Sequence, residues 1–167
     1  MKKIAVLVSS VVKNLELAQK LNTLALSLGH KSEIINLVEL NLPLYTSIIE
    51  ERDGVPQKVH DLQAYLLEFD AFIVVAPEYN GGVPPVLNNV IAWISRVSDD
   101  FRVVFEQKFV ALATHSGGQG AYVIDSMRLM FSYLGANILS RHIITNYSKP
   151  YNEKTAKSII EELIKYS

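Results

Sequence analysis

Short apolar runs alternate along this chain with segments in which apolar residues recur every three or four positions. The runs at 4–8, 71–76 and 109–114 are apolar almost throughout, which is typical of strands buried on both faces of a parallel sheet. Residues 32–37 form a run that polar residues interrupt, and residues 138–144 supply a fifth run. We therefore expect five strands, with the 32–37 strand nearer an edge of the sheet.

Segments with helical spacing separate these runs. The first follows Asn14, which we expect to cap a helix, and stops at Gly29, a residue type that commonly ends one. Another helix begins near Pro56, and the last spans residues 153–166. Residues 41–54 show no such period, so we expect a long irregular loop there, either functional or a plain surface excursion. The apolar positions of the five helices are Leu17, Leu21, Leu24 and Leu28; Val59, Leu62, Leu66 and Phe69; Leu87, Ile91 and Ile94; Val123, Met127, Met130 and Leu134; and Ala156, Ile160 and Leu163.

The alternation of strands and helices predicts an α/β protein in three layers, with helices on both faces of a five-stranded parallel sheet. The expected strand order is 2-1-3-4-5, which opens a crevice at the carboxyl ends of strands 1 and 3. The loops at 9–14, 77–85 and 115–120 border that crevice. No repeat, low-complexity tract or linker divides the chain, so we expect one domain over residues 1–167.

The charge and composition argue against several classes of function. Lys and Arg number 16 against 17 Asp and Glu, a net charge of −1, whereas a nucleic-acid surface needs a basic stripe. A small electron carrier that docks on basic partners is expected to be strongly acidic. The chain has no Cys, so any redox chemistry has to come from a bound cofactor and not from a thiol.

The N-terminal segment combines two lysines with a short apolar run at 4–8. A secretory signal needs about 7–15 apolar residues, and no stretch of the chain approaches the ~20 apolar residues of a membrane span. We therefore expect a cytoplasmic protein without a membrane segment and without a nucleic-acid partner.

The first crevice loop contains Ser9, Ser10, Lys13 and Asn14. Hydroxyl groups and free backbone N–H groups at a helix N-terminus favour a phosphate, and Lys13 is the only cation available there. The alternative is an ordinary strand-to-helix turn capped by Asn14. The spacing matches neither a P-loop nor a dinucleotide-binding glycine motif.

The second loop, Pro77-Glu78-Tyr79-Asn80-Gly81, follows the apolar run at 71–76. Its glycine lets the backbone approach a flat ligand closely, while Tyr79 and Asn80 offer a ring, a hydroxyl and an amide. The alternative is a tight turn with a surface tyrosine. For Glu78 we expect a structural role, as a contact with a helix dipole or with another subunit, and no role as a general acid.

The third loop, His115-Ser116-Gly117-Gly118-Gln119-Gly120, is rich in glycine and directly follows the run at 109–114. Such a loop suggests a backbone pressed against a ligand, with Ser116, Gly117, Gly118 and Gly120 as candidate contacts. The alternative is a plain strand-to-helix turn. His115 suits a proton donor, but a histidine at a strand end is more often simply hydrogen-bonded.

These motifs together resemble the NADPH-dependent FMN reductases, a group with a flavodoxin-like fold that includes quinone, chromate and azo dye reductases. The segment Leu42-Pro43-Leu44-Tyr45 and the pair Leu17-Ala18 also match the family. The first loop departs from it, because it is about three residues shorter than is usual and lacks the family's Arg. The matching positions of the second loop and its helix are Pro77, Glu78, Tyr79, Asn80, Pro84, Leu87, Asn89 and Trp93.

The resemblance implies a non-covalent FMN held by the three loops, with NADPH or NADH as the hydride donor. The reduced flavin would pass electrons to a small molecule such as a quinone, an azo compound or a metal oxyanion, and no side chain is nominated as catalytic. It also implies a homodimer or homotetramer, for which the candidate surfaces are residues 41–54, the helix of Trp93 and residues 96–102. The alternatives are a flavodoxin-type electron carrier, or a binding protein whose flavin site has degenerated.

Overall fold

Strands and helices alternate along the chain in the computed structural model, which describes residues 1–167. The strands are β1 (Lys3–Val8), β2 (Lys31–Asn36), β3 (Ala71–Val75), β4 (Phe109–His115), β5 (Asn137–Ile138) and β6 (Ile143–Thr145). The helices are α1 (Lys13–Ser27), α2 (Ser47–Asp53), α3 (Gln57–Leu67), α4 (Pro85–Ile94), α5 (Ala121–Tyr133) and α6 (Glu153–Tyr166). None of these helices is both long enough and apolar enough to cross a bilayer.

The sheet is parallel and has the order β2-β1-β3-β4-β5, with β6 also paired to β4. This confirms the predicted order and the edge position of the second strand. The fifth run is not one strand, however, because β5 and β6 pair with opposite ends of β4 and leave residues 139–142 between them. The N–H of Leu139 still donates to the carbonyl of Val110, and the guanidinium of Arg128 donates hydrogen bonds to the carbonyls of Leu139 and Ser140.

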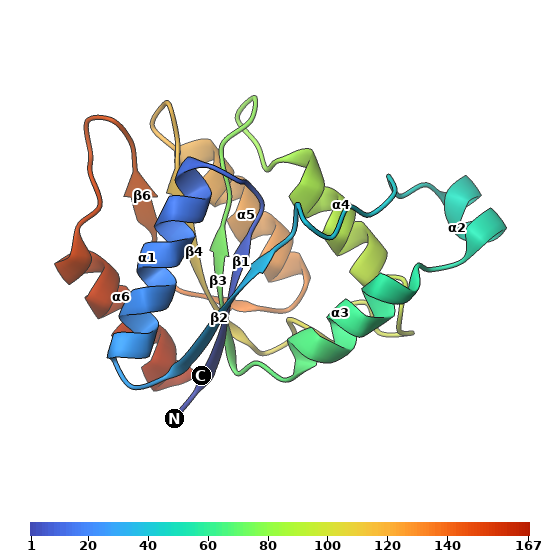
Figure 1. Cartoon of the computed structure of the whole chain (residues 1–167), viewed down its shortest axis with the longest axis horizontal. Helices are drawn as coiled ribbons and strands as arrows, with labels where there is room; N and C mark the ends of the chain where they lie inside the picture. Colours follow the sequence, from blue (N-terminus) through green and yellow to red (C-terminus); the bar gives the residue numbers. More distant parts are fainter.

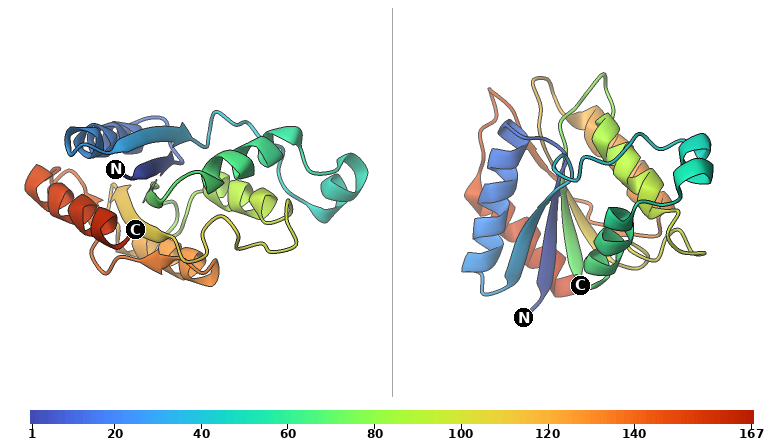
Figure 2. Two further views of the ribbon diagram at one scale, coloured as in Figure 1. Left: turned by 90° about the horizontal axis from the view of Figure 1, so that it is seen from below. Right: turned by 45° about the vertical axis from the view of Figure 1, so that its right-hand side comes forward.

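Helices cover both faces of the sheet, as Figure 1 and Figure 2 show. Ile4, Val6 and Val8 of β1 pack with α1 and α6 on one face. Ala5 and Leu7 belong to the core on the other face, under α3, α4 and α5. This alternation of side chains along a fully buried strand gives two separate cores, so the residues of β1 and β3 are apolar on both faces.

Helix α1 does not begin as predicted. It starts at Lys13, Val12 occupies the capping position without a side-chain hydrogen bond, and Asn14 lies inside the first turn. The prediction that Asn14 caps the helix is therefore wrong, because its amide is used elsewhere. Gly29 follows the helix with a φ of 82°, the left-handed conformation expected of a glycine that ends a helix.

Residues 41–54 are not wholly irregular, because they contain the short helix α2. The hydroxyl of Thr46 caps it by accepting a hydrogen bond from the backbone N–H of Ile49. The helix buries none of its own residues, so it has no apolar period by which a sequence pattern would reveal it. In Figure 1, α2 projects from the body of the molecule beside α4.

The segment before α2 is fastened to α4 by Trp93, which is fully buried. The indole N–H of Trp93 donates to the carbonyl of Pro43 at 2.7 Å, and its ring meets Tyr45 edge-on at 5.1 Å. Glu50 accepts from Arg96 at 2.8 Å and from the Tyr45 hydroxyl, and these hydrogen bonds lower the pKa of Glu50. The ring of Trp93 packs inside the protomer, so other residues of its helix would have to form any subunit surface there.

The buried face of β4 provides a test of this core. Leu112 is fully buried, so Leu112→Ala should lower the free energy of unfolding by about 2–5 kcal/mol, through lost burial and the cavity left behind. Urea denaturation would measure the change. Leu44→Ala removes the same atoms from a side chain that is 69% exposed and should change stability by less than about 0.5 kcal/mol. Equal losses in the two variants would contradict the assignment of the core.

Candidate functional site

The loops that follow β1, β3 and β4 meet at the carboxyl edge of the sheet, which we call the crest; it lies at the top of Figure 1. The backbone N–H of Ser9 donates to the carbonyl of Val75, and that of Ala76 to the carbonyl of Ala113. These bonds keep the three chain segments adjacent just as each strand ends. Because the order of the sheet reverses at β1 and β3, this edge is where an open α/β sheet binds its ligand.

Asn14 ties the first loop to the third through its side chain. Its amide donates to the carbonyl of His115 at 2.9 Å and accepts from the N–H of His115 at 2.7 Å. Asn14 is only 3% exposed, so both ends of its amide are committed to this pair. Its structural contribution is to fix the start of α1 against the end of β4.

Glu78 ties the second loop to the third. Helix α5 begins after Gly120, which has no side chain to cap it, and Glu78 Oε2 accepts from the N–H of Val123 at 3.3 Å. The hydroxyl of Ser116 lies 3.5 Å from the other carboxylate oxygen. A carboxylate at this position meets the positive end of the α5 dipole, which is the contact with a helix dipole that we expected for Glu78.

The second loop is a tight turn closed by two backbone hydrogen bonds. The N–H of Tyr79 donates to the carbonyl of Gly82 at 3.1 Å, and the N–H of Gly82 donates to the carbonyl of Tyr79 at 3.0 Å. Asn80 and Gly81 both have positive φ, 51° and 73°, as a two-residue turn of this kind requires. Pro77 is buried at its base, while Tyr79 and Asn80 project from the crest into solvent.

The third loop contains two kinds of glycine. Gly117 and Gly118 are exposed, and a Cβ at Gly117 would meet no atom within 4 Å. Gly120 is buried with a φ of 72°, and a Cβ there would lie 2.9 Å from Thr114 Cγ2. Gly120 is thus required by the fold, whereas Gly117 and Gly118 leave an open backbone surface. The hydroxyl of Ser116 points inward and accepts from the N–H of Gly118 at 3.0 Å.

The loop after β6 also reaches the crest, and sequence reasoning missed its residues. Asn146 donates to the carbonyl of Gly118 at 3.1 Å, and Thr145 donates to that of Thr114 at 3.2 Å. Since the Thr145 hydroxyl donates there, His115 Nδ1 has to donate to it in turn, at 3.0 Å. The available signal was position alone: residues 145–147 follow the fifth run just as the predicted loops follow theirs.

The side chains of the first loop face in different directions. Ser9 is 4% exposed and its hydroxyl points toward the carbonyl of Val75 at 3.4 Å. Lys13 is half-exposed and its ammonium lies 3.0 Å from Glu16. Ser10 is partly exposed, and Val11 and Val12 are exposed. The start of α1 therefore offers backbone N–H groups that no side chain caps.

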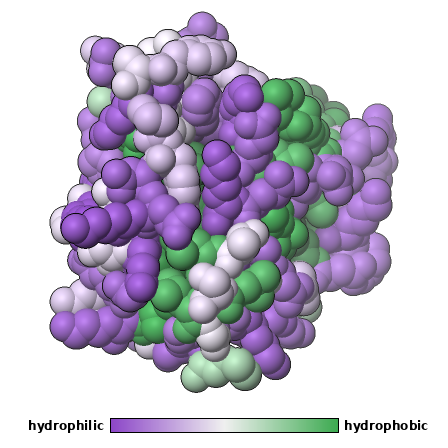
Figure 3. Space-filling model, turned by 60° about the vertical axis from the view of Figure 1, so that its left-hand side comes forward, coloured by the Kyte–Doolittle hydropathy of each residue, from purple (hydrophilic) through white to green (hydrophobic).

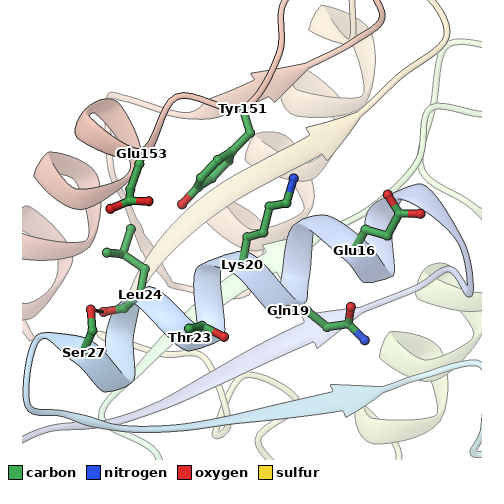
Figure 4. Close-up of a pocket in the computed structure, with 8 residues that line it drawn as sticks. All are labelled: Glu16, Gln19, Lys20, Thr23, Leu24, Ser27, Tyr151 and Glu153. Atoms are coloured by element: carbon green, nitrogen blue, oxygen red, sulfur yellow. Dashed lines mark hydrogen bonds between the residues drawn. The ribbon is translucent and has the colours of Figure 1, made fainter.

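Two large grooves run along the helices that cover the sheet, and a smaller pocket lies at the crest. An apolar groove of about 830 Å³ runs between α4 and α5, and a smaller pocket of about 240 Å³ adjoins His115 and Tyr147. A polar groove of about 640 Å³ lies between α1 and the start of α6, with the Lys20 ammonium facing the ring of Tyr151 (Figure 4). Figure 3 shows that hydrophilic side chains predominate on this side of the molecule.

Comparison with known sequences identifies one family and several relatives. The profile described as NADPH-dependent FMN reductase matches residues 2–149. A protein of Mycoplasma pneumoniae is 27% identical over 139 residues, which cover 80% of this chain and 82% of that protein. The quinone reductase of Escherichia coli is 31% identical over 103 residues, covering 60% of this chain and 53% of the reductase. The match thus spans about half the length of that enzyme.

Comparison with solved structures agrees with the fold. FerB, a flavoenzyme NAD(P)H:(acceptor) oxidoreductase from Paracoccus denitrificans, superposes with a TM-score of 0.77 at 22% identity, covering 99% of this chain and 97% of FerB. An azoreductase from Bacillus anthracis gives a TM-score of 0.65 at 17% identity, with 99% and 98% of the two chains covered. Both have the flavodoxin-like arrangement described above. Because the family profile matches residues 2–149, most of this chain, the chain belongs to the NADPH-dependent FMN reductase family.

Proposed function

We propose that the protein is an FMN-dependent NAD(P)H oxidoreductase. It would take hydride from NADPH or NADH and reduce a quinone, an azo compound, a metal oxyanion or a similar small acceptor. One observation carries this proposal: at the crest, the hydrogen-bonded turn from Tyr79 to Gly82 lies beside the open backbone of Gly117 and Gly118. The chain that carries this arrangement is a member of the NADPH-dependent FMN reductase family. The carboxylate of Glu78 holds these two surfaces together.

The crest fits a flavin. The exposed backbone of Gly117 and Gly118 is open enough for a flat ring, and Tyr79 and Asn80 add a hydroxyl and an amide beside it. The uncapped start of α1 offers backbone N–H groups to a phosphate. FMN, when bound, supplies the chemistry that accepts hydride from NAD(P)H and passes it to the second substrate.

The contribution of the chain is to bind and orient both substrates. Asn14 and Glu78 act as positioning residues, since their hydrogen bonds are made to protein backbone on either side of the third loop. Pro77, Gly81, Ser116 and Gly120 shape the loops that the ring would rest on. A cytoplasmic location fits this activity, because that compartment holds the nicotinamide nucleotides it would consume.

A homodimer formed through the groove between α4 and α5 is also part of this proposal. Leu129 and Tyr133 of α5 are 75% and 74% exposed beside the groove, and exposed apolar side chains gathered on one face commonly mark an association site. Ile91 of α4 and Phe101 line its other parts. The groove includes Arg96 and so joins one of the segments expected at a subunit boundary.

Flavin binding and turnover test the proposed function directly. Titration of the purified protein with FMN should quench flavin fluorescence to saturation, and the loaded protein should oxidise NADPH or NADH when a soluble quinone is added. A protein that binds FMN but oxidises neither nucleotide would act as an electron carrier. A protein that ignores FMN at high micromolar concentration would be a flavodoxin-like scaffold without this activity.

The dimer can be tested by charge. Leu129→Glu would place a carboxylate on the proposed contact and should convert the dimer to a monomer, as measured by light scattering after gel filtration. Leu26→Glu on α1 is a matched control, since Leu26 is 48% exposed on the opposite face of the sheet. A wild-type protein that is already monomeric, or an unchanged mass for Leu129→Glu, would exclude this interface.

The effect of Glu78 on FMN binding can be distinguished from its effect on protein stability. Glu78→Ala removes the cap of α5 and the link between two loops, so FMN should bind about five- to tenfold more weakly. Asn152→Ala removes the cap of α6, where Asn152 accepts from Thr155 at 2.9 Å, and should lower stability by about 1 kcal/mol with FMN affinity unchanged. Equal losses of affinity in both variants would reduce Glu78 to a general stabiliser.

A further inference from the structure

Two of the side chains that the sequence offers for a phosphate in the first loop are directed to partners within the protein. Asn14 gives both ends of its amide to the backbone of His115. The hydroxyl of Ser9 is buried and directed at the carbonyl of Val75. Only the partly exposed Ser10 remains available, and a hydroxyl carries no charge.

The cation of this loop is also neutralised locally. Lys13 Nζ lies 3.1 Å and 3.0 Å from the two carboxylate oxygens of Glu16, one turn further along α1. Glu16 opposes the attraction that the positive end of the helix would exert on an anion. The next lysine of α1, Lys20, lies seven positions on, about 10 Å along the helix axis, with its ammonium over the ring of Tyr151.

Apolar side chains occupy the positions directly before α1, where a cationic side chain could contact a phosphate. Val11 and Val12 are 57% and 60% exposed at the start of α1. Neither side chain offers a hydrogen bond, so a phosphate there would meet backbone N–H groups and the Ser10 hydroxyl, without a free cation. Recognition by backbone dipoles alone is weaker than recognition by an arginine fork, which adds charge and two parallel hydrogen bonds.

By contrast, the surface proposed for the flavin ring is held in place by several hydrogen bonds. The turn at Tyr79 is closed by its two hydrogen bonds, and Gly117 and Gly118 are open to solvent. The hydrogen bonds of Glu78 and Asn146 hold the third loop in place beside that turn. The two ends of the proposed flavin site are therefore unequal in their recognition chemistry.

We propose that this chain recognises a flavin through its ring system and gains little from the terminal phosphate, so that it accepts riboflavin nearly as well as FMN. The inference rests on the proposed function, since it concerns the same crest. It assigns the protein a broad flavin specificity, in which the phosphorylated and unphosphorylated forms compete for one site. The binding of either form depends on the turn at Tyr79 and the glycine backbone of the third loop.

Dissociation constants for FMN and riboflavin, measured side by side by fluorescence quenching, test this proposal. FMN should bind less than about tenfold more tightly than riboflavin, and raising the salt concentration should leave that ratio nearly unchanged. A preference for FMN of about a hundredfold or more would overturn the inference and leave the proposed function intact. Failure of both flavins to bind would overturn the proposed function, and this inference with it.

Two variants test the same point by gain of affinity. Glu16→Gln would free the charge of Lys13, and Val12→Arg would add a cation at the start of α1. Each should strengthen FMN binding by about tenfold and leave riboflavin binding unchanged. Glu51→Gln, an exposed glutamate of α2, is the matched control and should alter neither constant. Equal gains for both flavins would contradict a role of the phosphate end.

Discussion

The end of strand β4 is the point on which the arrangement of the crest depends. His115 is held there by the amide of Asn14 on one side and by the hydroxyl of Thr145 on the other. A few residues later the chain turns at Gly120, where no residue with a Cβ fits without displacing Thr114. The third loop is therefore fixed at both ends, and the first and second loops are positioned relative to it.

The second loop shows why this constraint matters. Glu78 lies at the end of β3, and its carboxylate reaches across to the start of α5. A helix that begins after glycine has no cap of its own, so two segments that are distant in sequence satisfy each other's polar groups. Removal of the Glu78 carboxylate would leave the backbone N–H of Val123 unpaired near the protein surface.

Much of this architecture could be predicted from the sequence, because it depends on local periods. The runs at 4–8, 71–76 and 109–114 became central strands, and Gly29 ended its helix as expected. The three loops could also be located, because parallel strands carry their carboxyl ends to one edge. Helix α2 could not be predicted, since a helix that buries no residue has no apolar face to reveal it.

The pattern of apolar and polar residues could not predict where individual side chains point or which partners they bind. Asn14 has the residue type and position of a helix cap, yet its partner lies 101 residues away. Trp93 closes a family motif in the sequence, but only the structure shows that it is buried and donates to the carbonyl of Pro43, 50 positions earlier. Such pairings depend on how distant segments come together, and no local spacing encodes them.

The turn from Tyr79 to Gly82 has a consequence for the thermodynamics and kinetics of association. Its two hydrogen bonds and two positive φ angles fix the backbone before any ligand arrives. Ordering a flexible loop removes conformational entropy at about 1–2 kcal/mol per residue, and a turn that folding has already ordered spares a ligand that penalty. A ligand that binds against this turn would then associate without waiting for the turn to order.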